Sequence, residues 1–147
     1  MVALLQRVRE SWVRIDGIEV ARIGRGLNIL LGVMQGDTSE DIEKLVKKIV
    51  NMRIFPNEAG KFDKNIIQIG GEALVVSQFT LAANIKRGNR PDFTAAMPPA
   101  EAQKLYEMFI AALREHIPVQ TGRFGAMMEV GIVNDGPVTI IADSQKL

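Results

Sequence analysis

The sequence ALVVSQFTL, residues 73–81, begins as an apolar run and becomes polar near its end. A short, unbroken apolar run such as residues 74–76 is typical of a strand that is buried on both faces. We therefore predict a buried strand over residues 73–81 that turns polar at Ser77-Gln78. Polar atoms at the end of such a strand either face water or line a pocket. Both readings stay open, since Thr80 also suits a plain strand end through its β-propensity.

Other strand-like runs precede this one. Residues 1–35 alternate short β-branched runs with turn residues, among them Asp16-Gly17 and Gly24-Arg25-Gly26. The mostly apolar run 27–33 is expected to be a central strand, and two or three antiparallel strands fit the whole region. The glycines at 24 and 26 do not make a dinucleotide-binding fingerprint, because the third glycine is missing and a strand follows where a helix is required.

Two stretches have the signatures of long helices. Thr38 is a candidate N-cap, and Asp41 three residues later completes a variant of the capping box. Apolar residues then recur at helical spacing to about Met52. Pro98-Pro99 is expected to begin the second helix, and Pro118 to end it.

The C-terminal region is expected to contain two strands, residues 124–133 and 138–142, joined through Asn134-Asp135-Gly136-Pro137. Proline cannot donate to a strand ladder, and the bond before proline adopts the cis form at a low cost of about 0.5–1 kcal/mol. A plain hairpin turn also explains Gly136-Pro137. Strand runs separated by two helices predict an α/β single domain over residues 1–147, with a mixed or antiparallel sheet.

Composition excludes several kinds of site. The chain has 147 residues, of which 47% are hydrophobic and 24% charged, as in an ordinary globular protein. It contains no cysteine, which excludes disulfides, a thiol nucleophile and cysteine-bearing metal sites. Its one histidine, His116, excludes a multi-histidine metal site within one chain and lies near a predicted helix end, where a capping or surface role is favoured over a catalytic one. No metal or cofactor is predicted.

The formal net charge is +1, so nonspecific binding along a nucleic-acid duplex is not expected, and DNA is not a predicted partner. Any contact with nucleic acid should be local, and two basic clusters could supply it or simply be solvated surface. They are Lys44, Lys47, Lys48 and Arg53, and Lys86, Arg87 and Arg90. The N-terminal residues become charged too early for a signal peptide, and no apolar run approaches the ~20 residues of a membrane span, so a cytoplasmic protein is expected.

Six motifs, in order along nearly the whole chain, are similar to those of the D-aminoacyl-tRNA deacylase family. They are Leu4-Leu5-Gln6-Arg7-Val8, Gly70-Gly71-Glu72, Val75-Val76-Ser77-Gln78-Phe79-Thr80-Leu81, Gly88-Asn89-Arg90-Pro91, Thr121-Gly122-Arg123-Phe124-Gly125-Ala126 and Asn134-Asp135-Gly136-Pro137-Val138-Thr139. Together they are far more specific than any one of them. The resemblance implies a mixed sheet or partial barrel flanked by two long helices, and an ester hydrolase that acts on the aminoacyl 3′ end of tRNA.

The resemblance also implies where the site lies. It implies a homodimer in which the Gly-cis-Pro motif of one subunit, here Gly136-Pro137, completes the pocket of the other and selects the D enantiomer. The opposite wall would be formed by Ser77, Gln78, Phe79 and Thr80. Arg7 matches a family arginine that supports the Gly-Pro motif, and Phe124 and Met128 match positions beside the 3′-terminal adenosine and that motif.

Two departures from the family pattern concern loops. The stretch Ala82-Ala83-Asn84-Ile85 lacks the Tyr-Gly-Asp found in some relatives, and Met127 stands where relatives often carry a polar residue. These differences affect the expected loop contacts to the substrate and leave the expected pocket residues unchanged.

The predicted wall contains no obvious catalyst. Thr80 could act as a nucleophile, but no base for its proton is visible in the sequence. We therefore favour assistance by the 2′-hydroxyl of the terminal ribose, with backbone N–H groups near Phe79 and Thr80 holding the carbonyl oxygen. Phe124 is a candidate to stack on the terminal adenosine, and core packing explains it equally well. Two other classes fit the residues: a dimeric module that binds RNA ends or amino-acid metabolites without catalysis, and a structural interaction protein.

Overall fold

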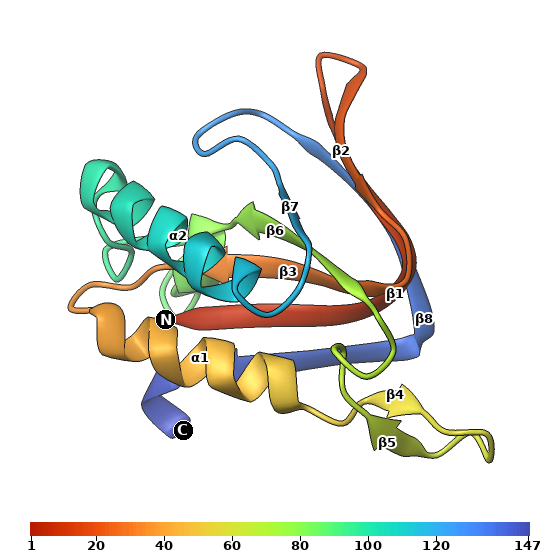
Figure 1. Cartoon of the computed structure of the whole chain (residues 1–147). Coiled ribbons are helices and arrows are strands. Elements are labelled where there is room, and N and C mark those ends of the chain that lie inside the picture. The colour runs from red at the N-terminus through yellow and green to blue at the C-terminus, as the bar shows by residue number, and fades with distance from the viewer.

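The computed structural model describes all of residues 1–147, and its main feature is a curved six-stranded sheet (Figure 1). The order of hydrogen-bonded strands is β2-β1-β3-β6-β7, and β8 pairs with β1. The strands are β1 Val2–Ile15, β2 Ile18–Ile23, β3 Gly26–Gly32, β6 Glu72–Ser77, β7 Val119–Thr121 and β8 Glu129–Asp143. A separate antiparallel pair is formed by β4 (Phe55–Pro56) and β5 (Phe62–Lys64).

The sheet is mixed. β1 pairs antiparallel with β2, β3 and β8, whereas β3 with β6 and β6 with β7 are parallel. On one side, the first part of β1 pairs with β3 and its second part with β2. On its other side, β1 pairs with β8 along most of its length. β2 also contacts β6 and β7, so the sheet curls into a nearly closed barrel. The prediction of an α/β fold with a mixed sheet or partial barrel is confirmed.

Two helices, α1 (Ser39–Asn51) and α2 (Pro99–Arg114), pack against the same face of the sheet (Figure 1). Side chains along a strand point alternately to opposite faces, and the sheet is apolar on both. Ala3 and Leu5 of β1, like Leu27 and Ile29 of β3, join the helices in the larger hydrophobic cluster. A smaller cluster consists of Val8, Val13, Ala21, Ile23, Leu74 and Val76.

Both helices begin where the sequence predicts. Thr38 is the N-cap of α1: its hydroxyl accepts a hydrogen bond from the Glu40 N–H, and the Asp41 carboxylate accepts one from the Thr38 N–H at 2.8 Å. α2 begins at Pro99, whose missing N–H is not needed in a first turn, and ends at Arg114. None of the helices combines the length and the apolar character that a membrane span requires.

The strand predicted over residues 73–81 is shorter in the structure. β6 ends at Ser77, and Phe79–Ala82 form a short 3₁₀ helix, η1. The Gln78 N–H still bonds to the Leu31 carbonyl at 2.8 Å, but β3 ends one residue after Leu31. The chain then has no partner on β3 and turns into local i→i+3 hydrogen bonds. The predicted strand is therefore a true strand only as far as Ser77, and a helical turn follows it.

The prediction of a C-terminal hairpin at residues 134–137 is also wrong. β8 runs without reversal and pairs with β1 on both sides of Gly136-Pro137. Where β1 advances by two residues, β8 advances by five, so the extra residues form a bulge in one continuous strand. Residues 124–128, predicted to be extended, lie outside β8, and the short strand β7 was not predicted.

Asp41 ties the start of α1 to the C-terminal end of the chain. Its Oδ1 accepts hydrogen bonds from the Ser144 hydroxyl at 2.7 Å and from the Gln145 side-chain amide at 3.2 Å. Burial raises the pKa of Asp41, but hydrogen bonds from the Thr38 N–H and the Ser144 hydroxyl outweigh this effect and hold the pKa below its usual value. The ionised carboxylate therefore stabilises the fold, and this contribution is lost as pH falls through the lowered pKa.

Asp41→Asn is expected to lower the free energy of unfolding near neutral pH by about 1–3 kcal/mol, because it weakens charge-assisted hydrogen bonds. The wild-type contribution is complete above the ordinary carboxyl pKa of about 4 and disappears at lower pH. Urea unfolding of both proteins at neutral pH and at about pH 2.5 measures the difference between them. This difference should shrink in acid. A difference that does not change with pH would show that the charge of Asp41 contributes nothing.

Candidate active site

Ser77 to Thr80, the first predicted wall of the site, lie at the end of β6. Gln78 connects the strand to the helical turn: its backbone N–H bonds to β3, and its side-chain amide donates a hydrogen bond to the Thr80 hydroxyl. Phe79 is 59% exposed, and its ring packs edge-on against Phe93, with the ring centroids 5.1 Å apart. The wall is thus a solvent-facing surface that is held by a strand end and a helical turn.

No base is hydrogen-bonded to Thr80. The hydrogen bond from Gln78 is the one side-chain hydrogen bond at its hydroxyl, so no histidine or carboxylate is bonded to it. His116 is exposed just beyond α2, and its backbone N–H bonds to the Leu113 carbonyl. A hydroxyl without a base is a weak nucleophile. The part that Thr80 plays in the reaction stays a prediction.

Gly136-Pro137, the second predicted wall, lies on the bulge of β8. The peptide bond between these two residues is cis, and both residues are exposed. Asn134 closes the base of the bulge, since its side-chain amide donates to the carbonyls of Arg7 and Val138, each at 3.0 Å. Gly136 has a φ of +121°, and a Cβ there would lie 2.8 Å from a methyl group of Val138, so the position requires glycine. The bulge presents exposed backbone on a fixed base.

Arg7 of β1 lies beside the bulge and is only 8% exposed. Its Nη1 donates to the Ile54 carbonyl at 2.7 Å, and its Nε lies 3.3 Å from the Asp135 carbonyl oxygen and 3.2 Å from the Asp135 carboxylate. A buried guanidinium is stable only with such partners, so Arg7 fixes Asp135 and with it the bulge. The structure therefore brings Arg7 and Gly136-Pro137 together.

The two predicted walls do not meet within one chain. Ser77 pairs with Leu31 of β3, and Leu31 pairs with Ala3 of β1. Gly136-Pro137 lies instead on β8, beside Arg7, four residues further along β1 than Ala3. Three strand spacings of about 4.8 Å also separate β6 from β8 across the sheet. Within one chain the two predicted walls are therefore separate surfaces.

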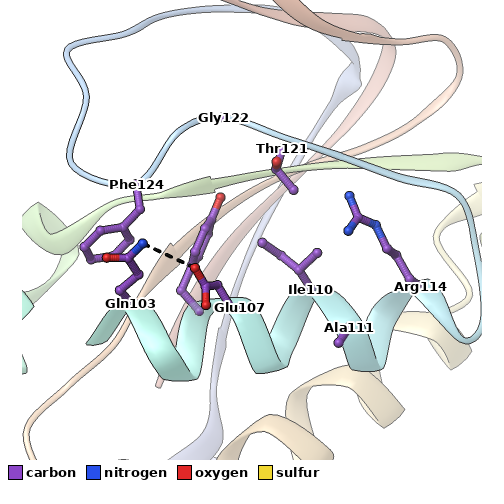
Figure 2. Close-up of a pocket in the computed structure, with 9 residues that line it drawn as sticks. Gln103, Glu107, Ile110, Ala111, Arg114, Thr121, Gly122 and Phe124 are labelled. Atoms are coloured by element: carbon purple, nitrogen blue, oxygen red, sulfur yellow. Dashed lines mark hydrogen bonds between the residues drawn. The ribbon is translucent and has the colours of Figure 1, made fainter. Parts of the chain in front are cut away.

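A pocket of about 270 Å³ lies between α2 and the segment that follows β7 (Figure 2). Nine residues line it: Gln103, Tyr106, Glu107, Ile110, Ala111, Arg114, Thr121, Gly122 and Phe124. Figure 2 shows Phe124 towards one end and Arg114 towards the other, with the Gln103 amide donating to the Glu107 carboxylate at 3.2 Å. Of the predicted site residues, Phe124 alone lines this pocket.

Tyr106 is a pocket residue that was missed in the sequence. Its hydroxyl donates to the Val75 carbonyl at 3.1 Å, and burial raises its pKa to about 12, so it stays protonated at neutral pH. Phe124 packs against its ring with the centroids 5.6 Å apart. Tyr106 continues the buried stripe that contains Ala102 and Phe109 of α2, so helical spacing marks it as core. The only sign of a further role in the sequence is that tyrosine brings a hydroxyl group to this apolar stripe, and a buried hydroxyl needs a hydrogen-bond partner.

Met128 contacts the same segment at Gly122. It is half-buried and packs against the smaller hydrophobic cluster. Its Sδ fills the space beside Gly122, where a Cβ would lie only 2.6 Å away. The neighbouring Met127 is 91% exposed. Met128 thus fixes the course of the segment that carries Phe124, and it does not line the pocket.

Comparison with known proteins identifies the family. A family model described as D-Tyr-tRNA(Tyr) deacylase matches residues 4–143. A D-aminoacyl-tRNA deacylase from a Nitratiruptor species is 71% identical to the chain over the whole of both proteins. The chain belongs to the D-aminoacyl-tRNA deacylase family. The resemblance found in the sequence is thereby confirmed, and so is the prediction that this deacylase is an ester hydrolase.

Two solved structures share the fold of this deacylase. One, named c-Myc DNA Unwinding Element Binding Protein, is 42% identical and has a TM-score of 0.93 over 97% of this chain and 98% of its own. The other, described as a probable eukaryotic D-amino acid tRNA deacylase, is 17% identical and has a TM-score of 0.80 over 96% of this chain and 97% of its own. At that identity the second likeness concerns the fold only.

Arg7→Lys is expected to destabilise the deacylase by about 1–3 kcal/mol, because an ammonium group cannot bridge the Ile54 carbonyl and Asp135 as a guanidinium does. Arg9 provides a matched control, since its side chain is 78% exposed and its Nε lies 3.7 Å from the same Asp135 carboxylate. Arg9→Lys should cost less than about 0.5 kcal/mol. Urea unfolding gives both values, and equally small losses would contradict the bridging role of Arg7.

Proposed function

We propose that this deacylase hydrolyses the ester bond of D-aminoacyl-tRNA, and of glycine wrongly attached to tRNA, and that it rejects L-aminoacyl-tRNA. The products are free tRNA and the amino acid. The observation that carries the proposal is a pair of firmly held motifs at the surface, Ser77 to Thr80 and Gly136-Pro137, that one chain does not bring together. Family membership supplies the reaction class, and the two motifs supply the surfaces that the reaction needs.

In this proposal a second copy of the chain completes each pocket. The bulge of β8 is exposed while its base is hydrogen-bonded, so it can enter another subunit without unfolding its own strand. A two-fold dimer places the bulge of each subunit over the partner's wall at the end of β6 and creates two equivalent sites. Ile141 of β8 is 71% exposed, and Phe62, whose ring lies 5.7 Å from the Arg7 guanidinium carbon, is also exposed, which gives apolar surface for the contact.

Chiral selection is assigned to exclusion by the Gly136-Pro137 backbone. The carbonyl groups of the bulge face the α-carbon of the bound amino acid, where an L side chain collides with them and a D side chain points away. A repulsive element against the wrong enantiomer gives specificity without a pocket shaped for one side chain. Arg7 and Asn134 keep this backbone in place. Glycine has no side chain to exclude and is therefore accepted.

Hydrolysis is assigned to water that the substrate helps to activate. The 2′-hydroxyl of the terminal ribose hydrogen-bonds the water, whose oxygen adds to the ester carbonyl carbon. The bond to the ribose 3′-oxygen then breaks, and this oxygen leaves with a proton. The first N–H groups of a helix have no partner within it, so we assign those of Phe79 and Thr80, at the start of η1, to the developing oxyanion. The absence of a base at Thr80 supports this assignment.

The terminal adenosine is assigned to the surface at Phe124. Its ring is half-buried and tilted against Tyr106, and the same pocket offers the Glu107 carboxylate and the Gln103 amide as polar partners. A stacking surface and a few polar contacts are enough to hold an unpaired RNA end. Met128 keeps the Phe124 segment in position. Recognition of this kind requires little overall positive charge, which agrees with a net charge of +1.

Incubation of the pure protein with D-tyrosyl-tRNA, L-tyrosyl-tRNA and glycyl-tRNA tests the proposed function directly. Release of the labelled amino acid should be rapid from the D-tyrosyl and glycyl substrates and at least about 100-fold slower from the L-tyrosyl substrate. Glycyl-tRNA that stays intact at high enzyme concentration would contradict selection by exclusion alone. Equal hydrolysis of both tyrosyl enantiomers would contradict a chiral gate.

The alternative is a dimeric module that binds RNA ends or amino-acid metabolites without catalysis, and one similar structure is named for DNA binding. Such a module would bind the three charged tRNAs and hydrolyse none of them. A structural interaction protein would also be inactive, and its self-association would be indifferent to tRNA. The same incubation separates these functions from the deacylase.

Thr80→Ala is expected to keep activity within about 10-fold of wild type, because the substrate and the backbone carry out the reaction. A substrate that ends in 2′-deoxyadenosine should react at least about 1,000-fold more slowly with the wild-type enzyme. Single-turnover rates at saturating enzyme measure both effects. A loss of about 1,000-fold or more in Thr80→Ala, with unchanged folding and binding, would restore Thr80 as the nucleophile.

A further inference from the structure

A short loop with its own hydrogen-bonded base follows the predicted wall. It spans residues 84–92 between η1 and α2. The Asn84 N–H bonds to the Asp92 carbonyl at 2.8 Å, and the Asp92 N–H bonds to the Asn84 carbonyl at 2.9 Å. Within the loop, the Lys86 N–H bonds to the Asn84 side chain at 2.9 Å, and Gly88 turns the chain with a φ of +64°. We name this segment the basic loop.

The basic loop carries three cations that the protein does not neutralise. Lys86, Arg87 and Arg90 are exposed, and none of their side chains forms an ion pair or a hydrogen bond. Asp92 is the one carboxylate of the loop. Its Oδ1 accepts a hydrogen bond from the Thr94 N–H at 2.7 Å, and this bond lowers the pKa of Asp92 and directs its carboxylate to the base of the loop.

The basic loop stands next to the wall at Ser77 to Thr80. Only Ala83 separates its first residue from η1, and Phe93, which follows its last residue, packs against Phe79. The loop that carries the three cations is therefore anchored beside the surface to which the ester is assigned. The other basic cluster differs in this respect. Lys44, Lys47 and Lys48 lie on α1, and Arg53 is paired with Asp63.

We propose that the basic loop binds backbone phosphates of the tRNA acceptor end, just upstream of the terminal adenosine, through Lys86, Arg87 and Arg90. This inference rests on the proposed function, because it takes the ester to lie against Ser77 to Thr80. Arginine binds phosphate oxygens with two parallel N–H groups, and lysine adds a point charge. A chain with a net charge of +1 concentrates three unpaired cations where a polyanion must approach, and so gains a local contact without wrapping a duplex.

The test compares two substrates that differ in phosphates. D-tyrosyl-tRNA carries the acceptor end, whereas D-tyrosyl-adenosine carries the ester and the terminal nucleoside without a phosphate. In the variant Lys86→Gln/Arg87→Gln/Arg90→Gln, the ratio of kcat/KM for tRNA to kcat/KM for the nucleoside ester should fall by about 10-fold or more at low salt. The slope of log kcat/KM for tRNA against log salt should become shallower by about 2, since each phosphate contact to a single strand contributes about 0.7.

Two control variants make the result specific. Lys44→Gln/Lys47→Gln/Lys48→Gln removes the same charge from the exposed face of α1, and its ratio and slope should equal those of wild type. Lys86→Arg/Arg87→Lys/Arg90→Lys keeps the loop charge and should keep the wild-type salt slope. Thermal unfolding checks that all three variants are folded.

The outcomes separate this inference from the function on which it rests. If wild type hydrolyses D-tyrosyl-tRNA and the loop variant keeps the wild-type ratio and salt slope, phosphate binding by the loop is overturned while the proposed function stands. An equal loss in the α1 variant would also overturn it, since total charge would then explain the effect. If wild type hydrolyses neither substrate, the proposed function fails and the inference fails with it.

Discussion

The rest of the site depends on the hydrogen bonds and the ion pair of the buried Arg7 guanidinium. A charge in this position has to be satisfied, and its partners are the Ile54 carbonyl and both the backbone and the side chain of Asp135. These bonds hold the extra residues of β8 out of the ladder while β1 and β8 continue to pair on either side. The sheet therefore displays the Gly136-Pro137 backbone at a fixed place, which a flexible hairpin would not do.

The site assigned to the reaction relies on backbone and position more than on reactive side chains. The Gln78 side-chain amide donates a hydrogen bond to the Thr80 hydroxyl, and no base is hydrogen-bonded to it. η1 begins where β6 loses its partner on β3, so the end of the ladder itself creates the N–H groups that we assign to the oxyanion. In our account one subunit contributes this turn and the other contributes the bulge. In the proposed reaction the bulge excludes the L enantiomer, and the substrate itself assists the hydrolysis.

The elements that short-range interactions stabilise could be predicted from short stretches of sequence. The capping box of Thr38 and Asp41 placed the start of α1, and ordered motifs identified the family. The errors have non-local causes. Residues 78–81 are predicted to continue the buried strand that begins at residue 73, but β3 ends beside them. Gly136-Pro137 was read as part of a hairpin, whereas pairing of β8 with the long strand β1 keeps the chain straight. Tyr106 is held at the pocket by a hydrogen bond from its hydroxyl to the carbonyl of Val75, which is 31 residues away in the sequence.

Mixing two inactive variants tests most directly whether the site is shared between subunits. Thr80→Trp blocks the wall, and Gly136→Val disrupts the bulge, where even a Cβ lies 2.8 Å from Val138. In a mixed dimer one site contains both intact walls and the other contains neither. Co-refolding the two variants should therefore restore hydrolysis of D-tyrosyl-tRNA to about one quarter of the wild-type rate. A mixture that forms mixed dimers and stays inactive would contradict a pocket completed by the partner subunit.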